Sequence, residues 1–195
     1  MNYLFWDTER IRNTKIYMQA YVLTDEYFNI ISKDIIIDSS IDVSHRHSPK
    51  SKVERLKSES IVFDNFNDVA NFMLPLLSNN KVVCFGKDDF VAFNDQLKIN
   101  GFQPITGTYY DLEILIKEEG KFPSNLADAA VLLEVKHDAH NPLSDSMVTM
   151  EYFKFSLNSF PEDRMLNQIP NKNKVLDIEA NGSYELKGKS KKQGC

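Results

Sequence analysis

The chain has 195 residues, of which 42% are hydrophobic and 26% are charged, and its formal net charge is −5 at pH 7. This length suits one domain of ordinary size, and the composition excludes an intrinsically disordered protein. The negative charge argues against broad, non-specific capture of nucleic acid, because that binding is driven by Lys and Arg side chains that neutralise phosphates.

The sequence predicts neither a membrane span nor a secretion signal. No segment approaches the roughly 20 apolar residues of a membrane span, and Asp7 and Glu9 fall where a signal peptide needs an apolar core. Cys84 lies in an apolar run and Cys195 is the last residue, which argues against a disulfide framework. We therefore expect a cytoplasmic protein with no membrane partner.

The first part of the chain predicts neighbouring β-strands. Residues 3–7 and 15–23 are rich in β-formers, and the run Ile35-Ile36-Ile37 predicts a third strand within residues 27–38. Residues 39–60 are polar and contain Pro49, which indicates a surface loop with a short helix over residues 52–56.

Helices alternate with strands in the rest of the chain. Apolar spacing predicts a helix over 66–77 capped by Asn65 or Asn67, a strand over 81–85, and a helix over 89–99 that ends at Gly101. Residues 109–115 fit a strand or the start of a helix, and helices are expected over 126–135 and 145–155. The apolar pattern weakens beyond Pro161, and the lysine-rich residues 186–193 predict a surface tail.

The order of these elements defines the fold class. Strands followed by alternating helices and strands predict an α/β fold, with a mixed sheet that has helices on both faces. We expect one main domain over residues 1–160 and a polar C-terminal extension over residues 161–195.

Two acidic residues share one face of the first strand. Asp7 and Glu9 are two residues apart, so their side chains point the same way, about 7 Å apart along the strand. Such a pair repels itself unless a cation neutralises it. The pair fits either a metal site or a solvated strand end.

Three further candidates follow in the chain. Asp89, with Asp88 as its competitor, stands where a strand gives way to a helix, so it is either a helix cap or a ligand. His140 precedes the last predicted helix and Asp145 lies at its start, with His137 nearby as an alternative histidine. A histidine with a pKa near 6.5 suits the deprotonation of water at neutral pH.

These residues, in this order, resemble the motifs of the DEDDh-type 3'-5' exonucleases, which are DnaQ-like enzymes of the RNase H-like fold. Phe5-Trp6-Asp7-Thr8-Glu9 is similar to the first motif, and His140-Asn141-Pro142-Leu143-Ser144-Asp145 to the third. The segment 82–90, with Gly86 three residues before Asp89, resembles the second motif of the KapD and Eri-like subgroup. The match covers roughly residues 3–155 and departs from the family at Pro142, Ser146 and the polar segment 39–60.

The resemblance implies a five-stranded RNase H-like sheet and a metal-dependent 3'-5' exonuclease. Asp7, Glu9, Asp89 and Asp145 would hold two divalent ions, Mg²⁺ or Mn²⁺, and His140 would be the general base. The substrate would be the 3' end of single-stranded DNA or RNA, and the product a nucleoside 5'-monophosphate.

Two other functions stay open at the level of sequence. One is a non-catalytic module on the same fold that binds nucleic acid or protein, and the other is a phosphohydrolase of small nucleotides. The run His45-Arg46-His47 resembles a metal-binding pair, but the Ser and Pro residues around it favour a solvated loop. The lysines at 187, 189, 191 and 192 fit a solvated tail better than a nucleic-acid contact.

Overall fold

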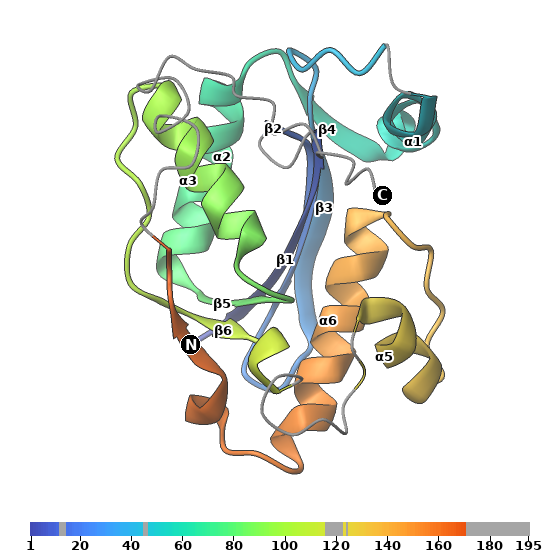
Figure 1. Ribbon diagram of the computed structural model, residues 1–195, viewed down its shortest axis with the longest axis vertical. Helices are drawn as coiled ribbons and strands as arrows, with labels where there is room; N and C mark the ends of the chain where they lie inside the picture. The colour runs from blue at the N-terminus through green and yellow to red at the C-terminus, as the bar shows by residue number, and fades with distance from the viewer. Residues whose placement is uncertain (12–14, 45–46, 116–122, 124, 171–195) are drawn as a thin grey trace, which may run out of the picture.

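The computed structural model describes residues 1–11, 15–44, 47–115, 123 and 125–170, and of residues 47 and 48 only the backbone. A mixed sheet forms its centre, and helices cover both of its faces (Figure 1). The elements in chain order are β1 Tyr3–Ile11, β2 Lys15–Thr24, β3 Ile30–Asp38, α1 His47–Leu56, η1 Lys57–Glu59, β4 Ser60–Phe63, α2 Phe66–Asn79, β5 Lys81–Cys84, α3 Asp88–Ile99, β6 Thr108–Asp111, α5 Leu126–Leu132, α6 Pro142–Leu157, η2 Glu162–Met165 and β7 Leu166–Gln168.

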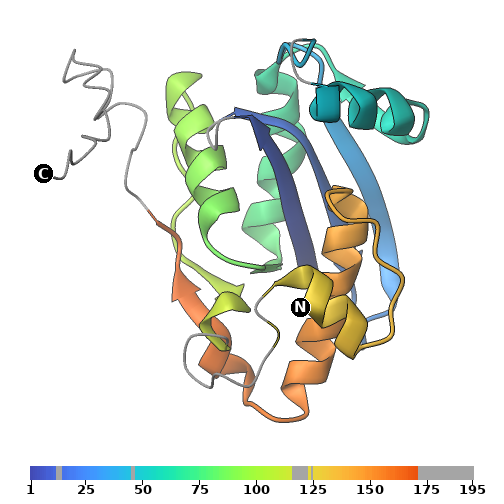
Figure 2. The ribbon, with the colours of Figure 1, turned by 45° about the vertical axis from the view of Figure 1, so that its right-hand side comes forward.

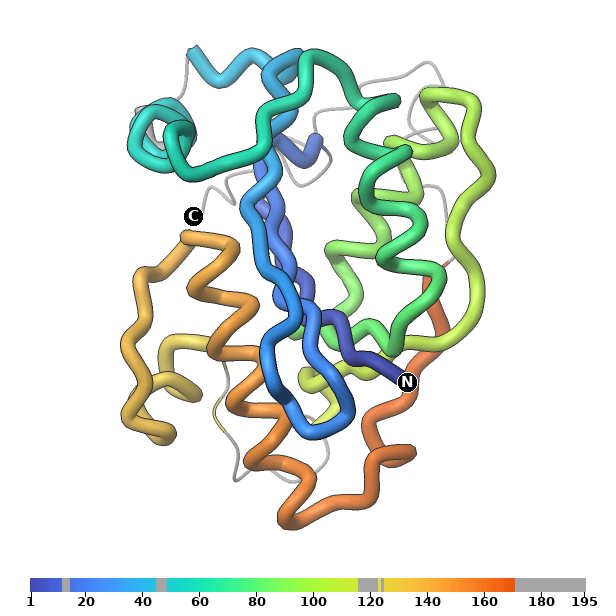
Figure 3. The backbone as a smooth tube through the Cα atoms, turned by 180° about the vertical axis from the view of Figure 1, so that it is seen from behind, coloured from blue at the N-terminus to red at the C-terminus, as the bar shows by residue number. Residues whose placement is uncertain are grey.

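Within the described residues, the sheet has seven strands in the order β4-β3-β2-β1-β5-β6-β7. β1, β2 and β3 form an antiparallel meander, seen from behind in Figure 3, whereas β5 and β6 run parallel to β1. β5 pairs with β1 only through Tyr3, Leu4 and Phe5, so the rest of β1 extends past the end of β5. The sheet opens at this point, beyond the carboxyl ends of the parallel strands β5 and β6. α/β proteins commonly bind ligands at such a place.

Alternation along β1 builds a core on each face of the sheet. Leu4 and Trp6 point to the face covered by α2 and α3, where Trp6 packs edge-on against Phe90 and Phe93. Tyr3 and Phe5 point to the opposite face and pack with α5 and α6. Figure 2 shows the two helical layers on either side of the sheet.

The structure confirms the α/β class, and it corrects the expected number of strands from five to seven. The additional strands lie at the two edges of the sheet: β4 has four residues and β7 has three. Strands this short carry almost no alternation of apolar and polar residues, and β7 lies beyond residue 160, in the predicted extension. An ion pair links η2 to the sheet: Lys81 Nζ of β5 donates to Glu162 Oε1 of η2 at 2.7 Å.

The helices begin and end close to the predicted positions. Asn65, rather than Asn67, caps α2, because its side chain accepts a hydrogen bond from the backbone N–H of Asp68 at 3.0 Å. The short helix expected over 52–56 is the longer α1, and residues 108–111 form a strand. The lysine-rich residues 186–193 lie outside the described residues. The same holds for the metal-binding pair considered in the run 45–47, since His45, Arg46 and the side chain of His47 are not described.

Candidate active site

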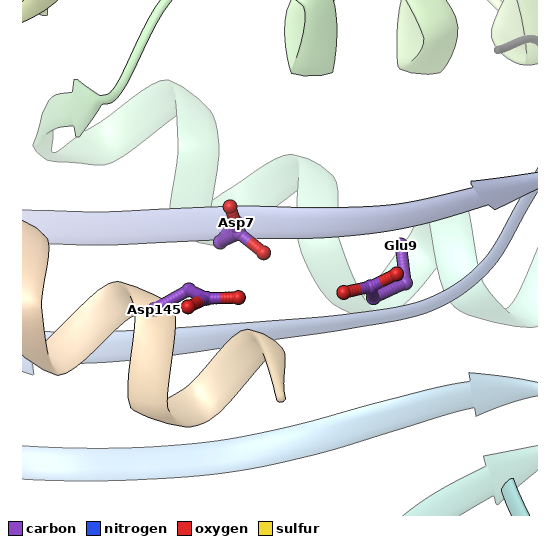
Figure 4. A group of neighbouring side chains, drawn as sticks. All are labelled: Asp7, Glu9 and Asp145. Atoms are coloured by element: carbon purple, nitrogen blue, oxygen red, sulfur yellow. The ribbon is translucent and has the colours of Figure 1, made fainter. Parts of the chain in front are cut away.

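Three carboxylates from two elements meet at the opening of the sheet. Asp7 and Glu9 come from β1 and Asp145 from the first turn of α6, and one oxygen of each lies within 4.8 Å of the others. Figure 4 shows the side chain of Asp145 directed toward the strand that carries the other two. The spacing of Asp7 and Glu9 therefore places both carboxylates on the α6 side of β1.

Asp89 approaches the same place from the other face of β1. Thr8 points to the α3 side, and its Oγ1 donates a hydrogen bond to Asp89 Oδ1 at 2.5 Å. Asp89 is 5% exposed, whereas the side chain of Asp88 is 61% exposed and lies 3.8 Å from Arg10. Of the two adjacent aspartates, Asp89 is thus the buried one that contacts β1, and Asp88 is the exposed one.

A cleft of about 380 Å³ lies beside Asp7 and Asp89. Four carboxylates and two cations line it: Asp7, Asp88, Asp89 and Glu113, with Arg10 and Lys87. A tight turn shapes its wall at Gly86, which has φ +99° and donates its backbone N–H to Asp111. A side chain at this φ would be strained, which explains the glycine.

Burial of several carboxylates together raises their pKa values. Burial, followed by repulsion from Asp89, Asp145 and Glu9, raises the pKa of Asp7 well above its usual value. Burial also raises the pKa of Asp89 to about 6, although the hydrogen bond from Thr8 opposes this change. The folded chain therefore holds negative charges close together at a cost in free energy, which a bound cation would relieve.

Glu9 lies among three groups that favour its charged form. Lys52 Nζ lies 3.6 Å from its Oε2, the Tyr17 hydroxyl donates to the same oxygen at 3.4 Å, and His140 Nδ1 lies 3.7 Å from its Oε1. Tyr17 is the extra residue of a β-bulge, because Glu9 pairs with Met18 and Arg10 with Ile16. Bulges of this kind commonly re-aim side chains beside active sites. Burial still raises the pKa of Glu9, against the effect of Lys52 and His140.

The two histidines of the third motif occupy different positions. His140 has φ +62°, and its side chain is 74% exposed beside Glu9. The side chain of His137 is only 11% exposed, and its Nε2 lies 2.6 Å from Asp145 Oδ1. Burial raises the pKa of Asp145, and this contact with His137 opposes the change.

The structure thus brings together all five residues singled out in the sequence: Asp7, Glu9, Asp89, His140 and Asp145. Four other residues contact them: Thr8, Tyr17, His137 and Lys52. Of these, only His137 could be named as a candidate from the sequence, because it lies shortly before α6. Tyr17 and Lys52 reach Glu9 through a bulge and a separate helix, features that no local motif encodes.

The comparisons with known proteins concern the fold. No protein-family model and no curated protein matches the chain. Its structure is similar to that of E. coli Exonuclease I in complex with a dA16 oligonucleotide, with a TM-score of 0.62, 15% identity, and coverage of 80% of this chain and 41% of that chain. The complex of the same enzyme with a dT13 oligonucleotide has a TM-score of 0.57 and 14% identity, and the match covers 79% and 40% of the two chains.

A further similar structure is an ExoI/SSB-Ct complex, with a TM-score of 0.62, 13% identity, and coverage of 80% and 41%. The chain therefore shares the fold of these structures and spans about two fifths of their length. Within the described residues, no helix is long and apolar enough to cross a membrane.

Proposed function

We propose that the protein is a metal-dependent 3'-5' exonuclease that shortens single-stranded nucleic acid and releases nucleoside 5'-monophosphates. One observation carries the proposal: the clustered oxygens of Asp7, Glu9 and Asp145, within 4.8 Å of one another, on a fold similar to that of Exonuclease I. The oligonucleotides named with the Exonuclease I structures support a single strand as the substrate.

The donor set fits hard divalent cations. Carboxylate oxygens suit Mg²⁺ and Mn²⁺, whereas a zinc site would favour Cys or several His ligands. Two divalent ions would balance the charges of four carboxylates, those of Asp7, Glu9, Asp89 and Asp145. When bound, such ions supply an activated water and neutralise the charge that develops on a phosphate during in-line displacement.

The protein's own residues would position the reactants and move one proton. Thr8 fixes the orientation of Asp89. His140 Nδ1 faces Glu9, which leaves Nε2 as the atom that would accept a proton from the attacking water. Its exposed position at the mouth of the site allows that proton to pass on to solvent. Arg10 and Lys87 line the cleft and would attract the phosphate into this acidic site.

A hydrolase of small nucleotides would use the same chemistry, and a cleft of about 380 Å³ has room for a single nucleotide. Substrate length separates the two functions. An exonuclease turns over oligonucleotides in preference to dinucleotides, whereas a small-nucleotide hydrolase has the opposite preference.

The test is digestion of 5'-labelled single-stranded DNA and RNA with Mg²⁺, with Mn²⁺ and with EDTA. We expect a metal-dependent ladder that shortens from the 3' end, lost in Asp7→Ala and retained in Asp88→Ala, the exposed neighbour of Asp89. Intact strands under every condition would refute the proposal and favour a non-catalytic binding module. Activity retained in Asp7→Ala would refute the assignment of the site.

A further inference from the structure

Helix α1 lies in the polar segment that departs from the exonuclease motifs, and its charge is opposite to that of the chain. Residues 47–57 contain four basic residues and one acidic residue in a protein of net charge −5. Figure 1 shows α1 beyond the N-terminal end of α6, the end that carries Asp145. The positive charge therefore lies at the margin of the candidate active site.

α1 is fixed in this position by packing and by an ion pair. Leu56 is 6% exposed and packs with Val53 in a cluster that includes Tyr17 of β2 and Leu143 of α6. On the same helix, Arg55 lies 3.0 Å from Asp138 Oδ2. Asp138 lies in the loop that leads to α6. Its backbone N–H donates to Ser144 Oγ of α6 at 2.8 Å, so the ion pair links α1 to the start of α6.

Lys52 is the basic residue of α1 that contacts a carboxylate of the candidate site. Its side chain is 16% exposed, and its Nζ lies 3.6 Å from Glu9 Oε2. By contrast, Lys50 of the same helix is 53% exposed and lies 3.8 Å from Glu54. One lysine of α1 therefore points to the site and another to a neighbouring turn of its own helix.

We propose that α1 forms the wall of the active site along which the substrate strand binds, and that Lys52 contacts a backbone phosphate of that strand. The inference rests on the proposed function. A carboxylate that binds a divalent cation loses much of its attraction for a neighbouring ammonium group, so Lys52 then needs another anion. A phosphodiester at the site is that anion, and the contact is independent of base sequence.

The test compares the full-length wild type with Lys52→Met, Lys52→Arg and the control Lys50→Met. Methionine keeps the apolar stem of the lysine and removes only its charge, and circular dichroism verifies the fold of each variant. The measurement is the fluorescence anisotropy of a 5'-labelled single-stranded oligonucleotide with Ca²⁺, over a series of salt concentrations. Kinetic constants are then measured with Mg²⁺.

We expect Lys52→Met to weaken strand binding about tenfold, the effect of one charge-assisted contact. The salt dependence of binding should fall by about one phosphate contact, and KM should rise more than kcat falls. Lys52→Arg should restore most of the affinity, and Lys50→Met should bind as the wild type does. If Lys52 only neutralised Glu9, its removal would leave strand affinity unchanged, and that result would overturn the inference.

The two proposals fail in different ways. A wild type that shortens strands, with equal binding by Lys52→Met and Lys50→Met, overturns the inference and leaves the proposed function intact. A wild type that binds strands without shortening them, with weaker binding by Lys52→Met, overturns the proposed function and retains the phosphate contact. Failure of the wild type both to bind and to cleave overturns both.

Discussion

Replacing Asp89 with Asn should stabilise the protein when no metal is present. Asp89 is 5% exposed, and burial raises its pKa from 3.8 to about 6. One pH unit of pKa difference corresponds to about 1.4 kcal/mol, so the ionised carboxyl costs the fold about 3 kcal/mol. This cost already includes the favourable interaction of the charge with the first turn of α3, so the gain expected from Asn at about pH 8 is at most about 3 kcal/mol.

The sign of the pH dependence follows from the raised pKa. The stability that the protonated carboxyl contributes is fully present below its unfolded pKa of 3.8 and is lost as the pH rises through about 6. Asp89→Asn should therefore match the wild type at about pH 4 and exceed it above about pH 7. The Thr8 hydroxyl keeps an acceptor, because the amide oxygen of Asn replaces the carboxylate oxygen.

Urea denaturation in EDTA measures this difference. Asp88→Asn is the matched control, because Asp88 is exposed and its pair with Arg10 contributes at most about 1 kcal/mol. If the proposed site binds Mn²⁺, its addition should reverse the order, because the wild type would gain stability by mass action. An Asp89→Asn variant no more stable than the wild type at alkaline pH would refute the claim that crowded, buried charge destabilises the metal-free site.

Three further predictions concern the fold and the proton acceptor. Asn65→Ala should lower the free energy of unfolding by about 1 kcal/mol in urea titrations, because it removes the cap of α2. Phe153→Ala should cost about 3–5 kcal/mol by the same measurement, because this buried ring packs against Tyr3 and Phe5; a smaller loss would argue against that core. His140→Ala should reduce kcat by about a hundredfold or more without weakening Mn²⁺ binding, whereas His137→Ala should alter metal affinity, and calorimetry with single-turnover kinetics separates the two.

Much of the fold could be predicted because its signals are local. Val69 and Met73 mark one face of α2, and Trp6 and Phe5 mark the two faces of β1. The edge strands β4 and β7 could not be predicted, because three or four residues cannot show a period. Their formation depends on neighbouring strands that already exist, as where Ser60 and Ile61 pair with β3.

The site could be predicted as far as its residues lie within short motifs. The spacing of Asp7 and Glu9 on a strand requires them to share a face. The hydrogen bond from Thr8 to Asp89 joins residues 81 positions apart, and the approach of Lys52 to Glu9 depends on the placement of α1. Contacts of this kind arise only when packing brings separate elements together, so they have no signature in a single sequence.

The central claim is that the clustered carboxylates hold divalent cations. Calorimetric titration of the metal-free protein with Mn²⁺ tests it most directly, beside Asp7→Ala and the control Asp88→Ala. We expect saturable binding of two ions by the wild type and by Asp88→Ala, and loss of that binding in Asp7→Ala. Absence of saturable binding by the wild type, or equal binding by all three proteins, would contradict the account.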